Sequence, residues 1–283
     1  MFKSLKRWWR YMGTKLGMTF EEMADPKVQL EQAIVEAQEQ HRRLKEQAAS
    51  VIDRNFGLGA HGTKLFIATP QDGGAVARMS PDLAQAAAAE THRRAGLVMT
   101  HPTDARGVID SVAAGADIVV HTTIDPPNAA WSPELVSSLV ERNVALVPTL
   151  MLWHYELDKR GAGDAAKAAV FDDAQRELVA FSSAGGQVLF GTDVGYMDRV
   201  DPTEEYVLLA RAGLTPMQIL ASLTTAPAAR WKEDARRGRV ASGFDADLVV
   251  LDGDPAVDVQ QLARVRCTIR GGRQVFARDV TAP

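Results

Sequence analysis

Three polar residues with metal-binding side chains end apolar runs of the sequence. His101 ends GLVMTH, His121 follows the apolar part of ADIVVHTT, and Asp193 ends QVLFGTD. If each run is a parallel strand, the three side chains meet at the carboxyl edge of one sheet, where α/β folds build their sites. Imidazole nitrogen and carboxylate oxygen are the usual ligands of Zn²⁺, Mn²⁺ and Fe²⁺. The pattern predicts a divalent metal site, although one such residue alone is more often a surface or turn residue.

Three further residues are candidates for the same site. Lys64 lies near the start of the run TKLFIAT, so we expect it deep in the sheet, where a lysine needs a partner or a modification. His154 follows the run at 144–152, and Tyr196 comes shortly after Asp193. We predict that His154 and Tyr196 line the substrate-binding mouth, while a merely structural role is the alternative for both.

The elements that must position these residues form a repeating pattern from about residue 55. We predict strands at 63–69, 96–101, 116–123, 144–152 and 187–193. Helical patterns separate or follow them at 81–96, 104–115, 132–143, 165–184, 202–213 and 215–231. Strict alternation predicts a parallel sheet with crossover helices, and short continuous apolar runs are typical of strands covered on both faces. The segments 246–255 and 265–279, with Gly271–Gly272 inside the second, predict a small β unit with a hairpin.

Residues 1–52 have a different character. Up to Leu16 there are five cations and no acid, and Trp8 and Trp9 lie among them. A short basic helix with an apolar, tryptophan-bearing side is typical of peripheral membrane contact, and docking onto a protein partner is the alternative.

A longer helix is predicted after Asp25, which would cap it, with Pro26 at its first position. Apolar and small residues then recur at alternating spacings of four and three, a heptad seam that indicates a coiled coil. The seam consists of Leu30, Ile34, Ala37, His41, Leu44, Ala48 and Val51.

The composition excludes several classes of protein. The chain has 283 residues, a formal net charge of −4 and a pI of about 5.9, so no basic field predicts nucleic-acid binding. One cysteine, Cys267, excludes an internal disulfide and favours a cytoplasmic location. No apolar run approaches the length of a membrane-spanning helix.

Residues 55–283 resemble the amidohydrolase superfamily, in particular its imidazolonepropionase-like and prolidase-like branch. The phrases that carry the resemblance include AAGADIVVHTT, GGQVLFGTDVGYMDRVDPTEEY and GRVASGFDADLVVLDGDP. The resemblance implies a (β/α)₈ TIM-like barrel with a small β-sandwich. This chain would contain units four to eight as a partial barrel, followed by a C-terminal β unit.

The same resemblance implies roles for the candidate residues. Lys64 matches a carbamylated lysine that bridges two metals, His101 and His121 match metal-binding histidines, and Asp193 matches the metal-site aspartate that accepts a proton from water. The implied chemistry is hydrolysis of a carbon–nitrogen bond in an amide, cyclic amide or peptide, with Zn²⁺ as the expected ion. The family's first strand carries His-x-His, and no two histidines of this chain are separated by one residue.

Residues 1–52 resemble the start of the phage-shock-protein A family through the phrase ADPKVQLEQAI. We therefore predict three parts: a phage-shock-like helical segment at 1–52, a partial hydrolase barrel at 55–232 and a β-sandwich remnant at 233–283. A homodimer would cover the sheet edges that a partial barrel leaves open. The alternative interpretation is a catalytically inactive, membrane-associated adaptor or fusion fragment.

Overall fold

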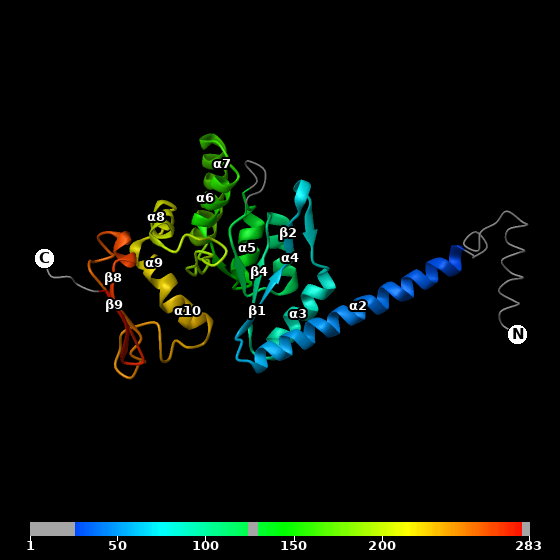
Figure 1. Ribbon diagram of the computed structural model, residues 1–283, viewed down its shortest axis with the longest axis horizontal. Coiled ribbons are helices and arrows are strands. Elements are labelled where there is room, and N and C mark those ends of the chain that lie inside the picture. The colour runs from blue at the N-terminus through cyan, green and yellow to red at the C-terminus, as the bar shows by residue number, and fades with distance from the viewer. Residues whose placement is uncertain (1–25, 124–129, 279–283) are drawn as a thin grey trace, which may run out of the picture. The chain divides into compact units, whose positions relative to one another are not determined.

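The computed structural model describes residues 26–123 and 130–278 (Figure 1). The chain divides into two compact units, Met1–Val51 and Ile52–Pro283. The predictions for Trp8, Trp9 and the cap at Asp25 lie outside the described residues. Within those residues, no helix combines the length and the apolar character needed to cross a lipid bilayer.

The long helix α2 spans Pro26–Gly57, and Pro26 is also the first residue that the structure describes (Figure 1). Proline suits the first helical turn because its missing N–H would have no partner inside the helix. Ion pairs between Glu39 and both Arg42 and Arg43 support the exposed side of the helix.

The second unit contains a parallel sheet of four strands, in agreement with the predicted α/β class. The strands are β1 (Gly62–Phe66), β4 (Leu97–His101), β5 (Ile118–Val120) and β6 (Ala145–Val147), in the order β1-β4-β5-β6. Phe66 pairs with His101, and Val120 pairs with Val147. The carboxyl ends of these strands therefore lie at one edge, where the sequence places its candidate residues.

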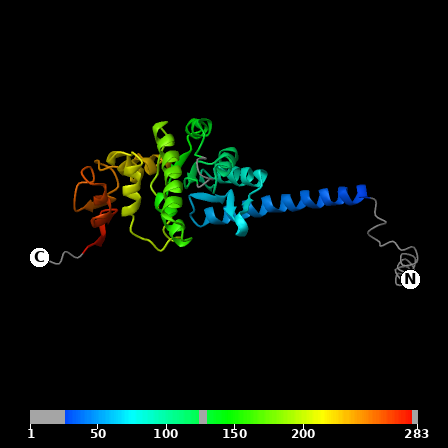
Figure 2. The same cartoon turned by 90° about the horizontal axis from the view of Figure 1, so that it is seen from above.

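The two faces of this sheet have different partners. One face, with Leu65 and Val98, packs in a core with α3 (Pro81–Arg93). The other face carries a smaller apolar cluster of Ile118, Val120, Ala145 and Leu189. Helices α4 (Ala105–Ala114) and α5 (Pro133–Glu141) follow β4 and β5, and the elements of this unit can be followed by their colours in Figure 2.

The predicted strand at 144–152 is wrong in its second half. Strand β6 ends at Val147, and helix α6 (Leu150–Lys159) begins three residues later. Pro148 cannot donate a hydrogen bond to a strand ladder, and Thr149 takes a left-handed conformation with φ of 48°. His154 consequently lies on a helix instead of following a strand.

The predicted strand at 187–193 is also shorter than expected. Only Val188 bridges to Leu146 in parallel fashion. Phe190 then donates its N–H to the carbonyl of Ser222, which takes the chain out of the ladder before Asp193.

Lys64 is exposed, so the prediction of a buried lysine is wrong. Strand β1 is an edge strand of the four-stranded sheet. Its side chains alternate, so that Leu65 is buried while Lys64 and Phe66 on the other face are exposed. The side chains of Lys64 and Phe66 are therefore both open to solvent on that face.

The remaining helices build the main core of the second unit. They are α7 (Asp164–Ser183), α8 (Thr203–Arg211), α9 (Pro216–Leu223) and α10 (Thr225–Arg230), and α7 confirms the predicted helix at 165–184. Phe181, Leu178 and Leu209 are fully buried in this core. A short hairpin of β2 (Ala68–Pro70) and β3 (Val76–Arg78), joined by η1 (Asp72–Gly74), follows β1.

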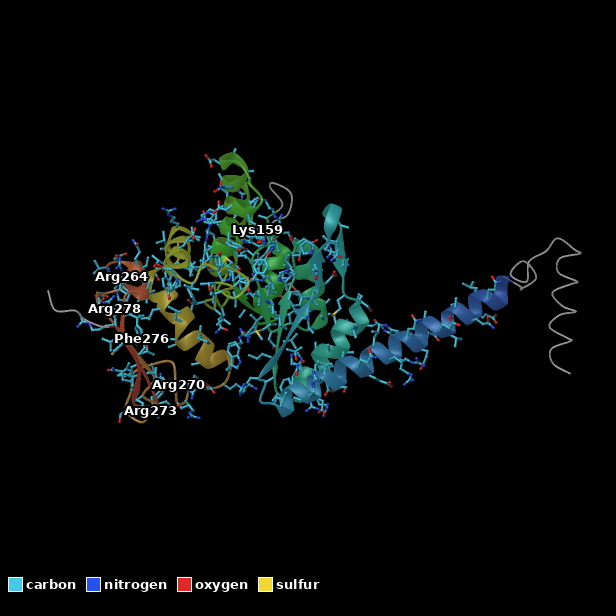
Figure 3. The ribbon with its side chains drawn as sticks, in the orientation of Figure 1. Lys159, Arg264, Arg270, Arg273, Phe276 and Arg278 are labelled. Atoms are coloured by element: carbon cyan, nitrogen blue, oxygen red, sulfur yellow. The ribbon has the colours of Figure 1, made fainter. Side chains whose placement is uncertain are left out.

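The predicted C-terminal hairpin is confirmed. Strands β7 (Leu248–Leu251), β8 (Val265–Arg270) and β9 (Arg273–Ala277) form an antiparallel sheet, with η2 (Val259–Ala263) before β8. Gly271 and Gly272 both have positive φ, which the tight turn between β8 and β9 requires. Figure 3 shows Arg270 and Arg273 at this turn and Phe276 further along β9, where its side chain is exposed.

We expect Gly107→Ala to destabilise the fold strongly, because a Cβ there would lie 1.8 Å from the carbonyl oxygen of Pro102. That oxygen belongs to the backbone just after β4, so the clash would displace the segment that follows His101. Overpacking of this kind costs roughly 3 kcal/mol in free energy of unfolding. Urea denaturation measures it, and Gly57→Ala, with open space around it, is the control that should change stability by no more than about 1 kcal/mol.

Candidate active site

Two of the predicted residues are in contact at the carboxyl edge of the sheet. The ring centroids of His101 and His121 are 4.7 Å apart in an edge-to-face arrangement. His121 is only 2% exposed, whereas His101 is half-buried and its ring centroid lies 5.1 Å from that of Phe66. The structure thus places the imidazoles at the ends of β4 and β5 in contact with each other.

The tautomer of His121 follows from its hydrogen bonds. The Thr149 hydroxyl donates its single proton to the Pro148 carbonyl at 2.8 Å, so its oxygen accepts a proton from Nδ1 of His121 at 2.7 Å. Nε2 therefore carries a lone pair. This atom is buried and has no hydrogen-bond partner. A buried nitrogen with a free lone pair is the donor that a divalent cation requires.

The segment that carries His121 is fixed at several points. The backbone N–H of His121 donates to the carbonyl of Val147, which extends the ladder between β5 and β6. Thr122 accepts a hydrogen bond from the indole of Trp153 at 2.8 Å. The buried carboxylate of Glu177 accepts bonds from both the N–H and the hydroxyl of Thr123. These contacts hold the imidazole in one orientation.

Three residues at this edge have a strained backbone. His121, Thr149 and Asp193 have φ values of 80°, 48° and 64°, in the left-handed region that β-branched and bulky residues rarely adopt. Such residues persist only where surrounding contacts over-determine them, and they gather at functional sites. All three lie just beyond strands or strand-like segments that end here.

Asp193 and Lys64 act on the histidines through charge. Burial lowers the pKa of His101, Lys64 lowers it further, and Asp193 opposes this shift. Burial lowers the pKa of His121 well below its ordinary value, and His101 and Lys64 act in the same direction. Both imidazoles are therefore neutral at neutral pH, the form that binds metals.

The ligand set is not assembled as a whole. Among the described residues, no group of three His, Cys, Asp or Glu side chains is close enough to hold one ion. The Nζ atom of Lys64 lies 5.4 Å from the ring centroid of Phe66. The chemistry of the two imidazoles fits a divalent cation, while Asp193 and Lys64 stand near the pair without completing it.

His154 and Tyr196 contact other residues. Nδ1 of His154 lies 2.6 Å from a carboxylate oxygen of Glu204, and its ring packs against Phe171. The Tyr196 hydroxyl donates to Glu156 at 2.6 Å, although the ring is largely exposed. These contacts tie α6 to α7, α8 and the segment after Asp193, and the role of both residues in substrate binding stays a prediction.

Sequence reasoning missed a buried carboxyl group behind His121. Glu205 on α8 is fully buried and accepts hydrogen bonds from the backbone N–H groups of Leu150 and Met151, at 3.0 and 2.7 Å. It therefore caps the start of α6 directly beyond Thr149, whose hydroxyl orients His121. Nothing in the local sequence EEY distinguishes Glu205 from a solvated glutamate, so only the packing identifies it.

Burial raises the pKa of Glu205 to about 8 from its ordinary value of 4.5. The folded protein then holds a proton that the unfolded chain releases between these pH values, so this group lowers the free energy of unfolding as pH rises from about 4.5 to 8. We expect Glu205→Gln to remove this dependence.

Between pH 5 and 8, the free energy of unfolding of Glu205→Gln should therefore rise relative to that of wild type, by at most about 4 kcal/mol. His101 and His121 have lowered pKa values and contribute the opposite slope, but they do so in both proteins. Urea midpoints at each pH measure the difference, and Glu141→Gln, an exposed change, is the control. A constant difference across the range would contradict the assignment.

A cavity of about 550 Å³ lies away from the two histidines, at the amino ends of the strands. Leu97, Asp117 and Gln187 line it together with Arg230, which bonds to Gln187 and to the carbonyl of Asn143. The cavity is therefore separate from the carboxyl edge at which His101 and His121 meet.

Comparison with known proteins gives a family and a fold. A family model described as Amidohydrolase family matches residues 84–276, more than half of the chain. A crystal structure of a Xaa-Pro dipeptidase with bound methionine in the active site has a TM-score of 0.71 at 20% identity, and the match covers 83% of this chain and 59% of that one.

Two other solved structures are similar. A prolidase complexed with N-methylphosphonate-L-proline has a TM-score of 0.67 at 24% identity, with 81% of this chain and 58% of that one covered. Ochratoxinase from A. niger has a TM-score of 0.68 at 19% identity, with 82% and 54% covered. The chain thus spans little more than half the length of these structures.

A curated relative is similar over a much shorter stretch. The PspA protein of Mycobacterium tuberculosis (strain ATCC 25177 / H37Ra) is 50% identical over 44 residues, which is 16% of this chain and 16% of the relative. Both resemblances that the sequence suggests are therefore found, the first over most of the chain and the second over a short segment.

Proposed function

This chain belongs to the amidohydrolase family, and on that premise we propose that it is a metal-dependent hydrolase of carbon–nitrogen bonds. The substrate would be an amide, a cyclic amide or a dipeptide. The observation that carries the proposal is the Nε2 atom of His121, which is buried, without a hydrogen-bond partner, and beside a second neutral imidazole.

His101 and His121 would hold the cation through their ring nitrogens, with Asp193 and Lys64 as the further ligands. Bound there, a divalent cation such as Zn²⁺ would bring the pKa of a bound water toward neutrality and polarise the substrate carbonyl. The positive charge of unmodified Lys64, which lowers the pKa of both histidines, would also repel such an ion. Carbamylation, which the family resemblance implies, would turn it into an anionic ligand, and its exposure leaves the amine accessible.

Asp193 would act as general base. A carboxylate at this position accepts a proton from the attacking water and later delivers it to the leaving nitrogen. Its half-exposed side chain and left-handed backbone support this role, because a proton acceptor must reach both water and substrate. His154 and Tyr196 would contact the substrate from the helical side of the site.

The remaining proposals concern the organisation of the molecule. The sheet would correspond to part of a (β/α)₈ barrel at 55–232, followed by a β-sandwich remnant at 233–283. Residues 1–52 would form a phage-shock-like segment, with Trp8 and Trp9 in peripheral contact with the inner face of a membrane and the hydrolase on the cytoplasmic side.

A second candidate function is an inactive, membrane-associated adaptor. Two observations favour it: the 44-residue similarity to a PspA protein, and the lack of a three-ligand group among residues 26–123 and 130–278. An adaptor of this kind would retain the family fold without turnover.

Hydrolysis of a panel of dipeptides, N-acyl amino acids and cyclic amides by the full chain separates the two candidates. The hydrolase proposal expects turnover that a chelator abolishes and that added Zn²⁺ or Mn²⁺ restores. An absence of turnover on every substrate, with either metal and with bicarbonate present to carbamylate Lys64, would favour the adaptor.

A further inference from the structure

Helix α2 carries a row of apolar side chains that its own unit leaves open to solvent. Leu30, Ile34, Leu44 and Val51 are between 47% and 61% exposed. They belong to the heptad seam, which lies along one side of the helix from Leu30 to Val51. Figure 3 shows side chains projecting from α2 along that length.

The charged residues of α2 form a separate face. Arg42 pairs with both Glu39 and Glu46, and Arg43 pairs with Glu39. In the heptad these residues occupy outer positions b, c and f, and the seam occupies a and d. A narrow apolar seam between polar flanks is the pattern of a helix that packs against one other helix.

We propose that this seam is an interface with α2 of a second copy of the chain, with the two helices antiparallel. When His41 is set opposite Ala37 of the partner, every layer follows from the spacing. Ile34 then meets the partner's Leu44, and Leu30 meets the partner's Ala48. These three layers, which the twofold axis repeats, each combine two branched apolar side chains or one large and one small side chain, which is how facing core positions fill space. Val51 lies beyond them, at the level of the partner's Lys27.

The charged residues beside the seam favour one relative direction of the two helices. In the antiparallel arrangement Glu31 faces the partner's Lys45, and the twofold axis repeats this pair. The other flanking positions from residue 31 to residue 47 carry no charge and meet only one another across the interface. They are Ala33, Gln38, Gln40 and Gln47. No like charges meet.

A parallel pair in register is less favourable on the same residues. It would set His41 against the partner's His41 in the centre of the seam, and Glu31 and Lys45 would lie too far apart along the axis to meet. Opposite charges across a coiled-coil flank set partner choice and orientation. Charge complementarity therefore favours a second antiparallel copy of α2 as the occupant.

Sedimentation of the full chain tests the interface. We expect a dimer at micromolar concentration, and we expect Ile34→Glu to give a monomer because it places a carboxylate inside the seam. Val35→Glu is the matched control: Val35 is 63% exposed but lies off the seam, so the dimer should persist. Because Ile34 and Val35 are both exposed in the isolated helix, neither change affects folding of the single chain. A wild-type monomer would overturn the proposal and would point to another occupant of the seam.

Charge exchange tests the antiparallel direction. Glu31→Lys alone and Lys45→Glu alone should each weaken dimerisation about tenfold at low salt, since both copies of the pair become repulsive. The double variant should regain wild-type affinity, and an equal mixture of the two single variants should form heterodimers. A dimer whose affinity the double exchange does not restore would overturn the antiparallel pairing. These measurements do not depend on hydrolysis. They therefore test the interface independently of the proposed activity.

Discussion

Asp193→Asn should reduce hydrolysis by 10²- to 10⁴-fold in kcat while the protein still binds its metal. Asparagine has the same size as aspartate and keeps an oxygen that can bind a metal, but its amide cannot accept the proton of the attacking water. The half-exposed position and the left-handed backbone at Asp193 suit a proton acceptor that faces the reacting atoms instead of the core.

The comparison variant for this experiment is Asp198→Asn. Asp198 lies in the same segment and is exposed, so replacing its carboxylate by an amide should leave turnover and metal content unchanged. Wild-type turnover in Asp193→Asn would remove the proton-transfer role. If Asp193→Asn lost its metal together with its activity, the main role of Asp193 would be that of a metal ligand, and its role as a base would be secondary.

Thr149→Val should weaken metal binding by about 10- to 100-fold. The hydroxyl of Thr149 accepts the Nδ1 proton of His121 and so fixes the tautomer that leaves Nε2 free. Valine has the same shape and keeps the β-branch, but it leaves the Nδ1–H buried without an acceptor. The imidazole would then lose its preferred orientation.

Thr149→Ser provides the control, because serine keeps the hydroxyl and this variant should retain most of the wild-type affinity for the metal. Isothermal titration with Zn²⁺ measures both variants, and the unfolding midpoint of the apo protein shows whether either change acts through stability alone. Equal metal affinity in Thr149→Val and wild type would show that the hydroxyl does not position His121.

Local pattern was sufficient for most of the fold. The helix at 165–184 and the hairpin at 265–279 could be predicted because helical periodicity and a Gly-Gly turn are properties of neighbouring residues. The run VALVPTLML could not be divided correctly, since it is apolar throughout and its division into β6 and α6 depends on Pro148, the strained Thr149 and the distant carboxyl group of Glu205.

The candidate site was predictable only in part, for a related reason. Strand ends identified His101 and His121, whose rings do meet. The exposure of Lys64 depends on what covers an edge strand, and this is a property of the whole sheet that the run TKLFIAT does not contain. The hydroxyl of Thr149 and the carboxyl group of Glu205 act through contacts between residues far apart in the sequence.

Titration of the purified full chain with Zn²⁺ shows whether His121 presents a metal-binding nitrogen beside His101. We expect binding close to one equivalent for wild type and a loss of that binding in His121→Ala. His92→Ala is the control, since His92 lies on α3 and contacts Asp117 instead of the site. Equal Zn²⁺ binding by wild type and His121→Ala, or none by wild type, would show that the two imidazoles do not form a metal site.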